Sequence, residues 1–304
     1  MPPSTIIRKF RWVDIEHWTF LFNSINGISS TEKAWDVELA QQFLSQLTYD
    51  PEKNCYLVDM NGKPVGYVLV SPELPIGRAV ASGGVSNQYQ NMGIGRILLA
   101  AALKRAKELG VSILHIQIQS EISAGRHLLE SSGFHCVRSF YDMMWQGKHI
   151  HVPDPPCGIA VRTFVISQDE EKLAQLQNAA FTSNWGFCPN TAEQIASKLN
   201  LKTYNPEGII LVTDGDNLAG YNWTMRIDGQ QGGIGKIAMT GVHPDYRRRG
   251  IGRIALLSGM RYLIAQGVNN IYLEVDGQNS AAMELYEATG FLRINQTVWY
   301  EKKL

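Results

Sequence analysis

The sequence predicts an α/β protein made of two tandem domains, each a mixed, mostly antiparallel sheet flanked by helices. The first observation behind this prediction is an internal repeat. The segment around Gly93 matches the segment around Gly250 in one register, 157 positions apart, and the same register aligns Gly110 with Gly267. About fifty residues match without a gap, which indicates two copies of one structural unit.

The second observation is the segment between the two copies, GKHIHVPDPPCG at Gly147–Gly158, which is rich in proline. Proline lacks a backbone hydrogen-bond donor and favours extended chain, so this composition is typical of a linker. A chain of 304 residues has room for about two domains. We therefore expect an N-terminal domain over residues 1–147, a linker over 148–157 and a C-terminal domain over 158–304.

The third observation is the succession of helical and extended patterns in the second copy. Apolar residues at helical spacing predict helices over 170–181, 191–199, 251–266 and 280–289. Runs rich in β-forming residues predict strands over 208–214, 218–227, 236–242, 271–275 and 297–302. Thr191 and Gln194 form a capping-box pair, and Gly267 and Gly290 follow two of the helices as C-caps. This order of helices and strands predicts a mixed sheet.

Composition narrows the classes of function. The 28 basic and 28 acidic residues balance, which argues against a general binder of nucleic acid or membrane surfaces. No apolar run approaches the ~18 residues of a membrane span, and the first residues lack the apolar core of a signal peptide. The four cysteines form no Cys-x-x-Cys pair, so we expect reduced thiols, no metal site and a cytoplasmic protein.

The segment HPDYRRRGIGR, His243–Arg253, places three arginines and two glycines between a predicted strand and a predicted helix. The first amide groups of a helix have no partner within it, and the helix dipole adds partial positive charge there. Gly250 and Gly252 let an anion approach the backbone, which predicts a phosphate site. The alternative is a glycine-rich turn with solvated arginines. There is no Walker lysine, and Ala255 in place of a third glycine weakens the dinucleotide interpretation.

The segment VHPDYRRRGIGR, followed about thirty residues later by NSAAMELYEATGF, resembles the GNAT superfamily of N-acetyltransferases. The tandem arrangement is similar to that of the mycothiol synthase group within this superfamily. The resemblance covers both halves and is strongest from about residue 218 to residue 291. It implies a GNAT-like fold in each domain and acetyl-CoA as the acyl donor.

The resemblance also implies roles for individual residues. The loop after the strand would hold the pyrophosphate of CoA, and the strand itself would pair with the pantetheine arm. Tyr286 would protonate the departing thiolate, and the alternative for Tyr286 is a core aromatic residue. The expected cofactor-binding residues are Thr240, Val242, Arg247, Arg248, Arg249, Gly250, Ile251, Gly252, Arg253 and Asn279.

The first copy departs from this pattern. Leu129 stands in place of Tyr286 and Ile122 in place of Asn279, so we expect the N-terminal domain to do no chemistry. Its glycines remain, so two alternatives stay open: a domain that still binds CoA and a purely structural domain. The residues that would hold CoA there are Val85, Gln90, Gly93, Gly95 and Arg96.

The sequence leaves the general base and the acceptor unassigned. Lys236 stands where the resemblance would place a glutamate; Glu274 or a water chain is a candidate base, and an exposed carboxylate is the alternative for Glu274. The aromatic loop at residues 181–189 either closes over a substrate or is held against the core. We expect an N-acetyltransferase acting on a small-molecule amine or a peptide, as a monomer or homodimer. The alternative is a non-catalytic acyl-CoA-binding sensor.

Overall fold

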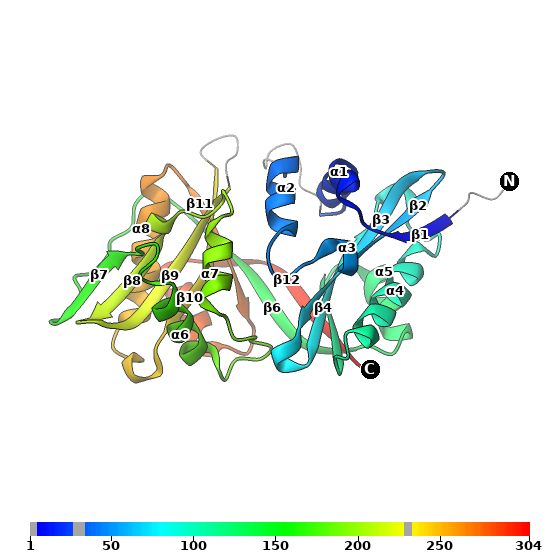
Figure 1. Ribbon diagram of the computed structural model, residues 1–304. Coiled ribbons are helices and arrows are strands. Elements are labelled where there is room, and N and C mark those ends of the chain that lie inside the picture. Colours follow the sequence, from blue (N-terminus) through cyan, green and yellow to red (C-terminus); the bar gives the residue numbers. More distant parts are fainter. Residues whose placement is uncertain (1–4, 27–33, 228–232) are drawn as a thin grey trace. The chain divides into compact units, whose positions relative to one another are not determined.

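The computed structural model describes residues 5–26, 34–227 and 233–304 (Figure 1). The chain forms two compact units, which we call unit 1, Met1–Phe140 with Gln296–Leu304, and unit 2, Tyr141–Asn295. Each unit is a mixed, mostly antiparallel sheet with helices on its faces, as the sequence predicts. The segment 147–158 contains neither helix nor strand.

The sheet of unit 1 has the strand order β1-β2-β3-β4-β5-β12. Its strands are β1 (Thr5–Lys9), β2 (Cys55–Met60), β3 (Lys63–Glu73), β4 (Arg78–Val85), β5 (Ile113–Gln119) and β12 (Leu292–Lys303). β4 and β5 are parallel, whereas β1 with β2, β2 with β3, β3 with β4 and β5 with β12 are antiparallel. The helices are α1 (Ile15–Ile25), α2 (Val37–Leu44), α3 (Pro51–Asn54), α4 (Ile94–Glu108) and α5 (Ser123–Ser131). One core cluster lies under α1 and α2, and a second lies under α4.

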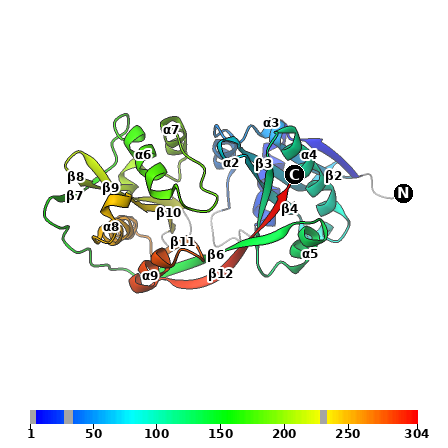
Figure 2. The ribbon, with the colours of Figure 1, turned by 90° about the horizontal axis from the view of Figure 1, so that it is seen from below.

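The sheet of unit 2 has the strand order β6-β11-β10-β9-β8-β7. Its strands are β6 (His135–Gln146), β7 (Ile159–Thr163), β8 (Ile209–Asp214), β9 (Asn217–Ile227), β10 (Ile234–Val242) and β11 (Asn270–Asp276). The helices are α6 (Glu170–Phe181), α7 (Ala192–Leu199), α8 (Ile251–Ala265) and α9 (Ser280–Thr289). Figure 2 shows α6 and α7 on one side of this sheet and α8 on the other.

The predicted helices of the second copy are confirmed, including the capping box in which Thr191 and Gln194 bond reciprocally. The sequence analysis missed β7 because its apolar run Ile159–Val161 shows no alternation of apolar and polar residues, although Ile159 and Val161 pack against a core cluster.

The last strand of each copy of the repeat, β6 or β12, does not follow the expected domain boundaries. Residues Thr297–Lys303 of β12, at the end of the second copy, pair with β5 of unit 1. Conversely, β6 enters unit 2 from Tyr141 onward. Two copies of one strand fit either sheet, so the repeat itself cannot specify which sheet each closing strand joins.

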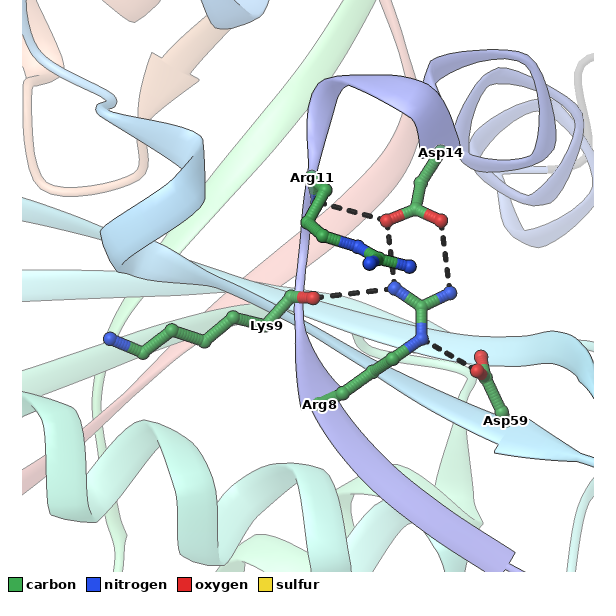
Figure 3. A network of polar contacts seen from close by, with 5 residues as sticks. All are labelled: Arg8, Lys9, Arg11, Asp14 and Asp59. Atoms are coloured by element: carbon green, nitrogen blue, oxygen red, sulfur yellow. Dashed lines mark hydrogen bonds and ion pairs between the residues drawn. The ribbon is translucent and has the colours of Figure 1, made fainter.

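A polar network joins the first strand of unit 1 to its first helix (Figure 3). The two terminal nitrogens of Arg8 donate to the two carboxylate oxygens of Asp14 at 2.7 and 2.9 Å. The backbone amide of Arg11 donates to the same carboxylate at 2.9 Å, and Arg8 Nε donates to Asp59 at 2.6 Å. A paired fork of this kind fixes the angle at which the chain enters α1.

Unit 2 has an equivalent Arg–Asp ion pair between its first strand and its first helix. The guanidinium of Arg162 donates to both oxygens of Asp169 at 2.6 and 2.8 Å, and the amide of Val165 donates to Asp169 Oδ2 at 2.8 Å. The repeat therefore extends back to the first strand of each half, beyond the fifty residues in which the sequence shows it.

This network predicts how Asp169→Asn affects stability. The Arg162 hydrogen bond lowers the pKa of Asp169, outweighing the burial that raises it. The carboxylate therefore stabilises the fold above its unfolded pKa of ~3.9, and this contribution is lost as the pH falls through the lower folded pKa. We expect the variant to lower the free energy of unfolding by about 2 kcal/mol at neutral pH. Urea denaturation should show the deficit shrinking as the pH falls below the unfolded pKa of ~3.9. The exposed Asp154→Asn is the control, and equal stability of Asp169→Asn and wild type at neutral pH would contradict the prediction.

Candidate active site

The loop between β10 and α8 forms an anion site from the backbone. Gly250 is the N-cap of α8 with φ 78°, and the helix's first hydrogen bond runs from the Ile254 amide to the Gly250 carbonyl at 3.1 Å. The amides of residues 251–253 precede that bond and have no acceptor within the helix. A Cβ added at Gly250 would meet no atom within 4 Å, so the space above this residue is open. These features fit the pyrophosphate of an acyl-CoA.

The backbone of this loop is repeated in unit 1. Arg248 and Gly250 have φ values of 61° and 78°, and their counterparts Asn91 and Gly93 have 62° and 81°. Asparagine and glycine adopt this left-handed conformation readily, whereas arginine does so at a cost of roughly 1 kcal/mol. Strain of this kind is typical of ligand-binding loops.

Two of the four arginines of the motif contact neighbouring parts of unit 2. Arg247 Nη2 donates to the carbonyl of Ala180, at the end of α6, at 2.8 Å. The guanidinium of Arg249 lies 5.4 Å from the centre of the Tyr246 ring. All four side chains, including those of Arg248 and Arg253, are exposed. The sequence analysis expects all four to bind the cofactor, and this stays a prediction. The contacts of Arg247 and Arg249 also hold the loop in place.

The two parallel strands of unit 2 part beside this loop. β10 pairs with β11 over Ile234–Lys236 within the described residues, but pairs with β9 as far as Val242, with a bulge between Ile237 and Met239. The last residues of β10, including Thr240, therefore offer one edge of backbone groups to an extended ligand. β4 parts from β5 in the same way after Ala81, but pairs with β3 without a break in register.

Tyr286 lies on α9 and is 8% exposed, in the core cluster between the sheet and α8. Burial raises the pKa of its phenol, and a hydrogen bond with the Thr240 side chain lowers that pKa in part. The phenol is thus protonated at neutral pH, which is the form that a general acid requires. The sequence left two alternatives for Tyr286, a general acid and a core aromatic residue. They are compatible, because the ring packs in the core while the hydroxyl lies near the strand that is expected to bind the cofactor.

Asn279 is the N-cap of α9, and its Oδ1 accepts a hydrogen bond from the Ala282 amide at 3.2 Å. The sequence signal for this role is an asparagine directly before a helical pattern. Asn279 therefore has a structural task in addition to the cofactor contact that the resemblance implies. Ile122, its counterpart in unit 1, makes no such cap.

The face of the unit 2 sheet opposite α8 and α9 carries Asp142, Lys236 and Glu274. The sequence neighbours of each pack toward α8 and α9, so these three side chains point to the other face. Burial raises the pKa of Asp142, while the positive charge of Lys236 lowers it in part. Glu274 is exposed. The sequence analysis missed Asp142 because residue 142 falls in the expected N-terminal domain and enters unit 2 through β6.

Unit 1 contains a cavity of about 660 Å³ beside its own glycine loop. Its walls include all five residues that the sequence analysis named for CoA in this half: Val85, Gln90, Gly93, Gly95 and Arg96. Leu129 and Ile122, the replacements for the acid and the asparagine, also line it. The volume falls within the usual range of small-molecule sites.

Metal ligands and membrane-spanning helices are the remaining features to consider in unit 1 and unit 2. The described residues contain no group of three or more His, Cys, Asp or Glu side chains that could hold a metal ion. Within the same described ranges, no helix is both long and apolar enough to cross a membrane.

Parted strands beside a glycine loop at the start of a helix occur in both units and are the arrangement expected of the GNAT fold. A family model described as "Acetyltransferase (GNAT) family" matches residues 12–134 and 170–291. The chain belongs to this family and is an acetyltransferase of the GNAT type.

Curated relatives agree with this assignment. The chain is 30% identical over 264 residues to a mycothiol acetyltransferase of Stackebrandtia nassauensis, which covers 84% of each chain. It is 30% identical over 248 residues to the mycothiol acetyltransferase of Gordonia bronchialis, covering 77% of each.

Two solved structures share the fold. A GCN5-related N-acetyltransferase from Sphaerobacter thermophilus matches with a TM-score of 0.77 and 22% identity, over 98% of this chain and 95% of that one. A tandem GNAT protein from the clavulanic acid biosynthesis pathway matches with a TM-score of 0.78 and 15% identity, over 99% and 98%.

Proposed function

We propose that the protein transfers an acetyl group from acetyl-CoA to a primary amine of a small molecule or peptide, in unit 2, by direct attack in a ternary complex. One observation carries this proposal. Unit 2 combines the anion site at the head of α8 with a buried, protonated phenol at Tyr286, whereas unit 1 has Leu129 at the equivalent position. A leucine cannot donate a proton, so unit 1 lacks the acid.

Acetyl-CoA supplies an activated acyl thioester when it is bound. The backbone amides of residues 251–253 bind its pyrophosphate, and the exposed Arg248 and Arg253 add positive charge. The open edge of β10 near Thr240 and Val242 binds the extended arm of the donor. A backbone amide on this edge stabilises the oxyanion that forms as the amine attacks.

Two side chains move protons in this scheme. Tyr286 gives its hydroxyl proton to the departing thiolate, which is reasonable because a phenol and an alkyl thiol have pKa values within about two units of each other. Asp142 accepts the proton of the attacking amine. Burial raises its pKa, which brings this carboxylate closer to the pKa that a general base needs near neutral pH.

Unit 1 holds a CoA-type ligand without chemistry in this proposal. The cavity beside Gly93 and Gly95 favours this alternative over a purely structural domain. A titration calorimetry stoichiometry of two CoA molecules per chain is the expected result. A stoichiometry of one would favour the structural alternative.

The proposal is tested by incubating the protein with acetyl-CoA, a thiol reagent and a panel of amines. The relatives named mycothiol acetyltransferase make desacetylated mycothiol the first acceptor to test, followed by glucosamine and a tripeptide. Amine-dependent thiol release that is lost in Tyr286→Phe is the expected result. Tight CoA binding without turnover on any amine would favour the non-catalytic sensor. A monomer or homodimer in the cytoplasm, with no nucleic-acid or membrane partner, stays part of the proposal.

Asp142→Asn tests the base. The wild-type rate should fall as the pH drops through the raised pKa of this carboxyl, because a base must be deprotonated to act. The variant should lose about 100-fold in kcat and lose this acid limb of the pH profile. Glu274→Gln, on the same face of the sheet, is the matched control. It should keep the wild-type kcat and the acid limb of the pH profile. A larger loss in the control than in Asp142→Asn would assign the base to Glu274.

A further inference from the structure

Asn222 and Thr240 form a buried polar pair on the strands that lead to the site. They are cross-strand partners on β9 and β10, and Asn222 Nδ2 donates to Thr240 Oγ1 at 2.7 Å. Asn222 is 0% exposed. Because Thr240 Oγ1 accepts this bond, the hydroxyl's own hydrogen is left to donate. Asn222 faces α8, and the Tyr286 phenol lies in the core cluster on this same face of the sheet, where Thr240 influences its pKa.

A glycine on α8 makes room for the asparagine. A Cβ added at Gly259 would lie 1.9 Å from Asn222 Oδ1, so no larger residue fits beside this amide. Oδ1 itself is buried and has no hydrogen-bond partner among the described residues. A buried unsatisfied acceptor costs stability, and an apolar side chain would avoid that cost. The amide of Asn222 therefore occupies this position although it lowers the stability of the surrounding core.

Unit 1, which lacks the phenol, has different residues at the positions equivalent to this polar pair and its neighbours. Asn222 and Val68 each follow a Gly-Tyr dipeptide, and Val68 lies opposite Gly83 as Asn222 lies opposite Thr240. The repeat register places Leu129 at the position of the phenol and Ala102 at that of the glycine on α8. The amide, the hydroxyl, the phenol and the glycine that admits the amide are thus all absent together from unit 1.

We propose that Asn222 and Thr240 are positioning residues that hold the Tyr286 phenol as a proton donor. The amide of Asn222 donates to Thr240 Oγ1, and the Thr240 hydroxyl donates to Tyr286 Oη. The phenol's own hydrogen is thereby directed away from Thr240, toward the leaving thiolate. As the proton moves, the O–H bond of Tyr286 breaks and an S–H bond forms, and the resulting phenolate keeps the Thr240 hydrogen bond that stabilises it.

The first test measures the pKa of residue 286 in the protein without ligands. Fluorotyrosine in place of tyrosine makes the phenol more acidic, and ¹⁹F NMR follows its titration, with the resonance assigned by its loss in Tyr286→Phe. Thr240→Val, which keeps the shape of the side chain, should raise this pKa by about one unit. Thr240→Ser should restore the wild-type value, and Asn222→Val should raise the pKa less than Thr240→Val. An unchanged pKa in Thr240→Val would overturn the proposal.

The second test rests on the proposed function and uses acetyl-CoA with hydroxylamine, an acceptor small enough to need no specific pocket. Thr240→Val should lower kcat about 10- to 100-fold with little change in the KM for acetyl-CoA. In the Tyr286→Phe background, Thr240→Val should cause no further loss, because it acts through the phenol. The same loss in both backgrounds would assign Thr240 a structural or cofactor-binding role and overturn the relay.

Different results would overturn the proposed acetyltransferase function and the positioning role of Asn222 and Thr240. A wild-type protein that releases no thiol with hydroxylamine or any amine of the panel would overturn the proposed function, and with it the catalytic use of the relay. Turnover that depends on Tyr286 but is unaffected by Thr240→Val would overturn the relay alone.

Discussion

Replacing Tyr286 by phenylalanine should lower kcat by about 100- to 10,000-fold, the usual worth of a general acid. The phenylalanine ring fills the same space in the core cluster, so the loss reports the missing hydroxyl and not a cavity. The wild-type rate should also fall at high pH, as the raised pKa of the phenol is approached, because an acid must be protonated to act. This alkaline limb should be absent from the variant.

Steady-state kinetics over a range of pH would check this prediction. Tyr262→Phe is the matched control, because Tyr262 is a partly buried tyrosine on α8 of the same unit. Full activity in Tyr286→Phe would show that the thiolate leaves without this proton, and the assignment of catalysis to unit 2 would lose its main support.

The variant Tyr300→Ala should lower the free energy of unfolding by about 3–5 kcal/mol, the usual cost of removing a buried aromatic side chain. Tyr300 lies on β12, is 1% exposed and packs in the core cluster of unit 1. Its hydroxyl donates to Glu130 at 2.6 Å and accepts from Arg126 Nε at 3.2 Å. The loss should fall on unit 1, although residue 300 ends the second copy of the repeat.

Hydrogen exchange would locate the effect. Tyr300→Ala should lower the protection of β5, whose residues pair with β12, and leave the amides of β10 protected. Phe291→Ala removes a comparably buried ring from unit 2 and should show the reverse pattern. Loss of protection in β10 rather than β5 in Tyr300→Ala would show that β12 stabilises unit 2, and would contradict the assignment of the end of β12 to the sheet of unit 1.

Much of the fold follows from local patterns in the sequence. The helices of the second copy have apolar residues at the right spacing and capping signals at their ends, and the structure places α7 and α9 within a residue of the predicted bounds. The glycine loop is also local, because the left-handed conformations at residues 248 and 250 depend on the residues of the loop itself. Features of this kind need no knowledge of distant partners.

The relay and the candidate base depend on pairing between distant segments, which the sequence does not display. Simple alternation from Ile237 would direct Met239 toward α8, but the bulge between these residues shifts the pattern and brings Thr240 to that face instead. Asp142 is hidden for a similar reason, because β6 joins the sheet of the other half of the repeat.

The most direct measurement of the central claim is a crystal structure of the protein grown with coenzyme A. Our account predicts the pyrophosphate within hydrogen-bonding distance of the backbone amides of residues 251–253 in unit 2, with the pantetheine arm along the open edge of β10. A crystal in which this helix start stays empty, together with a calorimetric titration that registers no binding, would contradict the account.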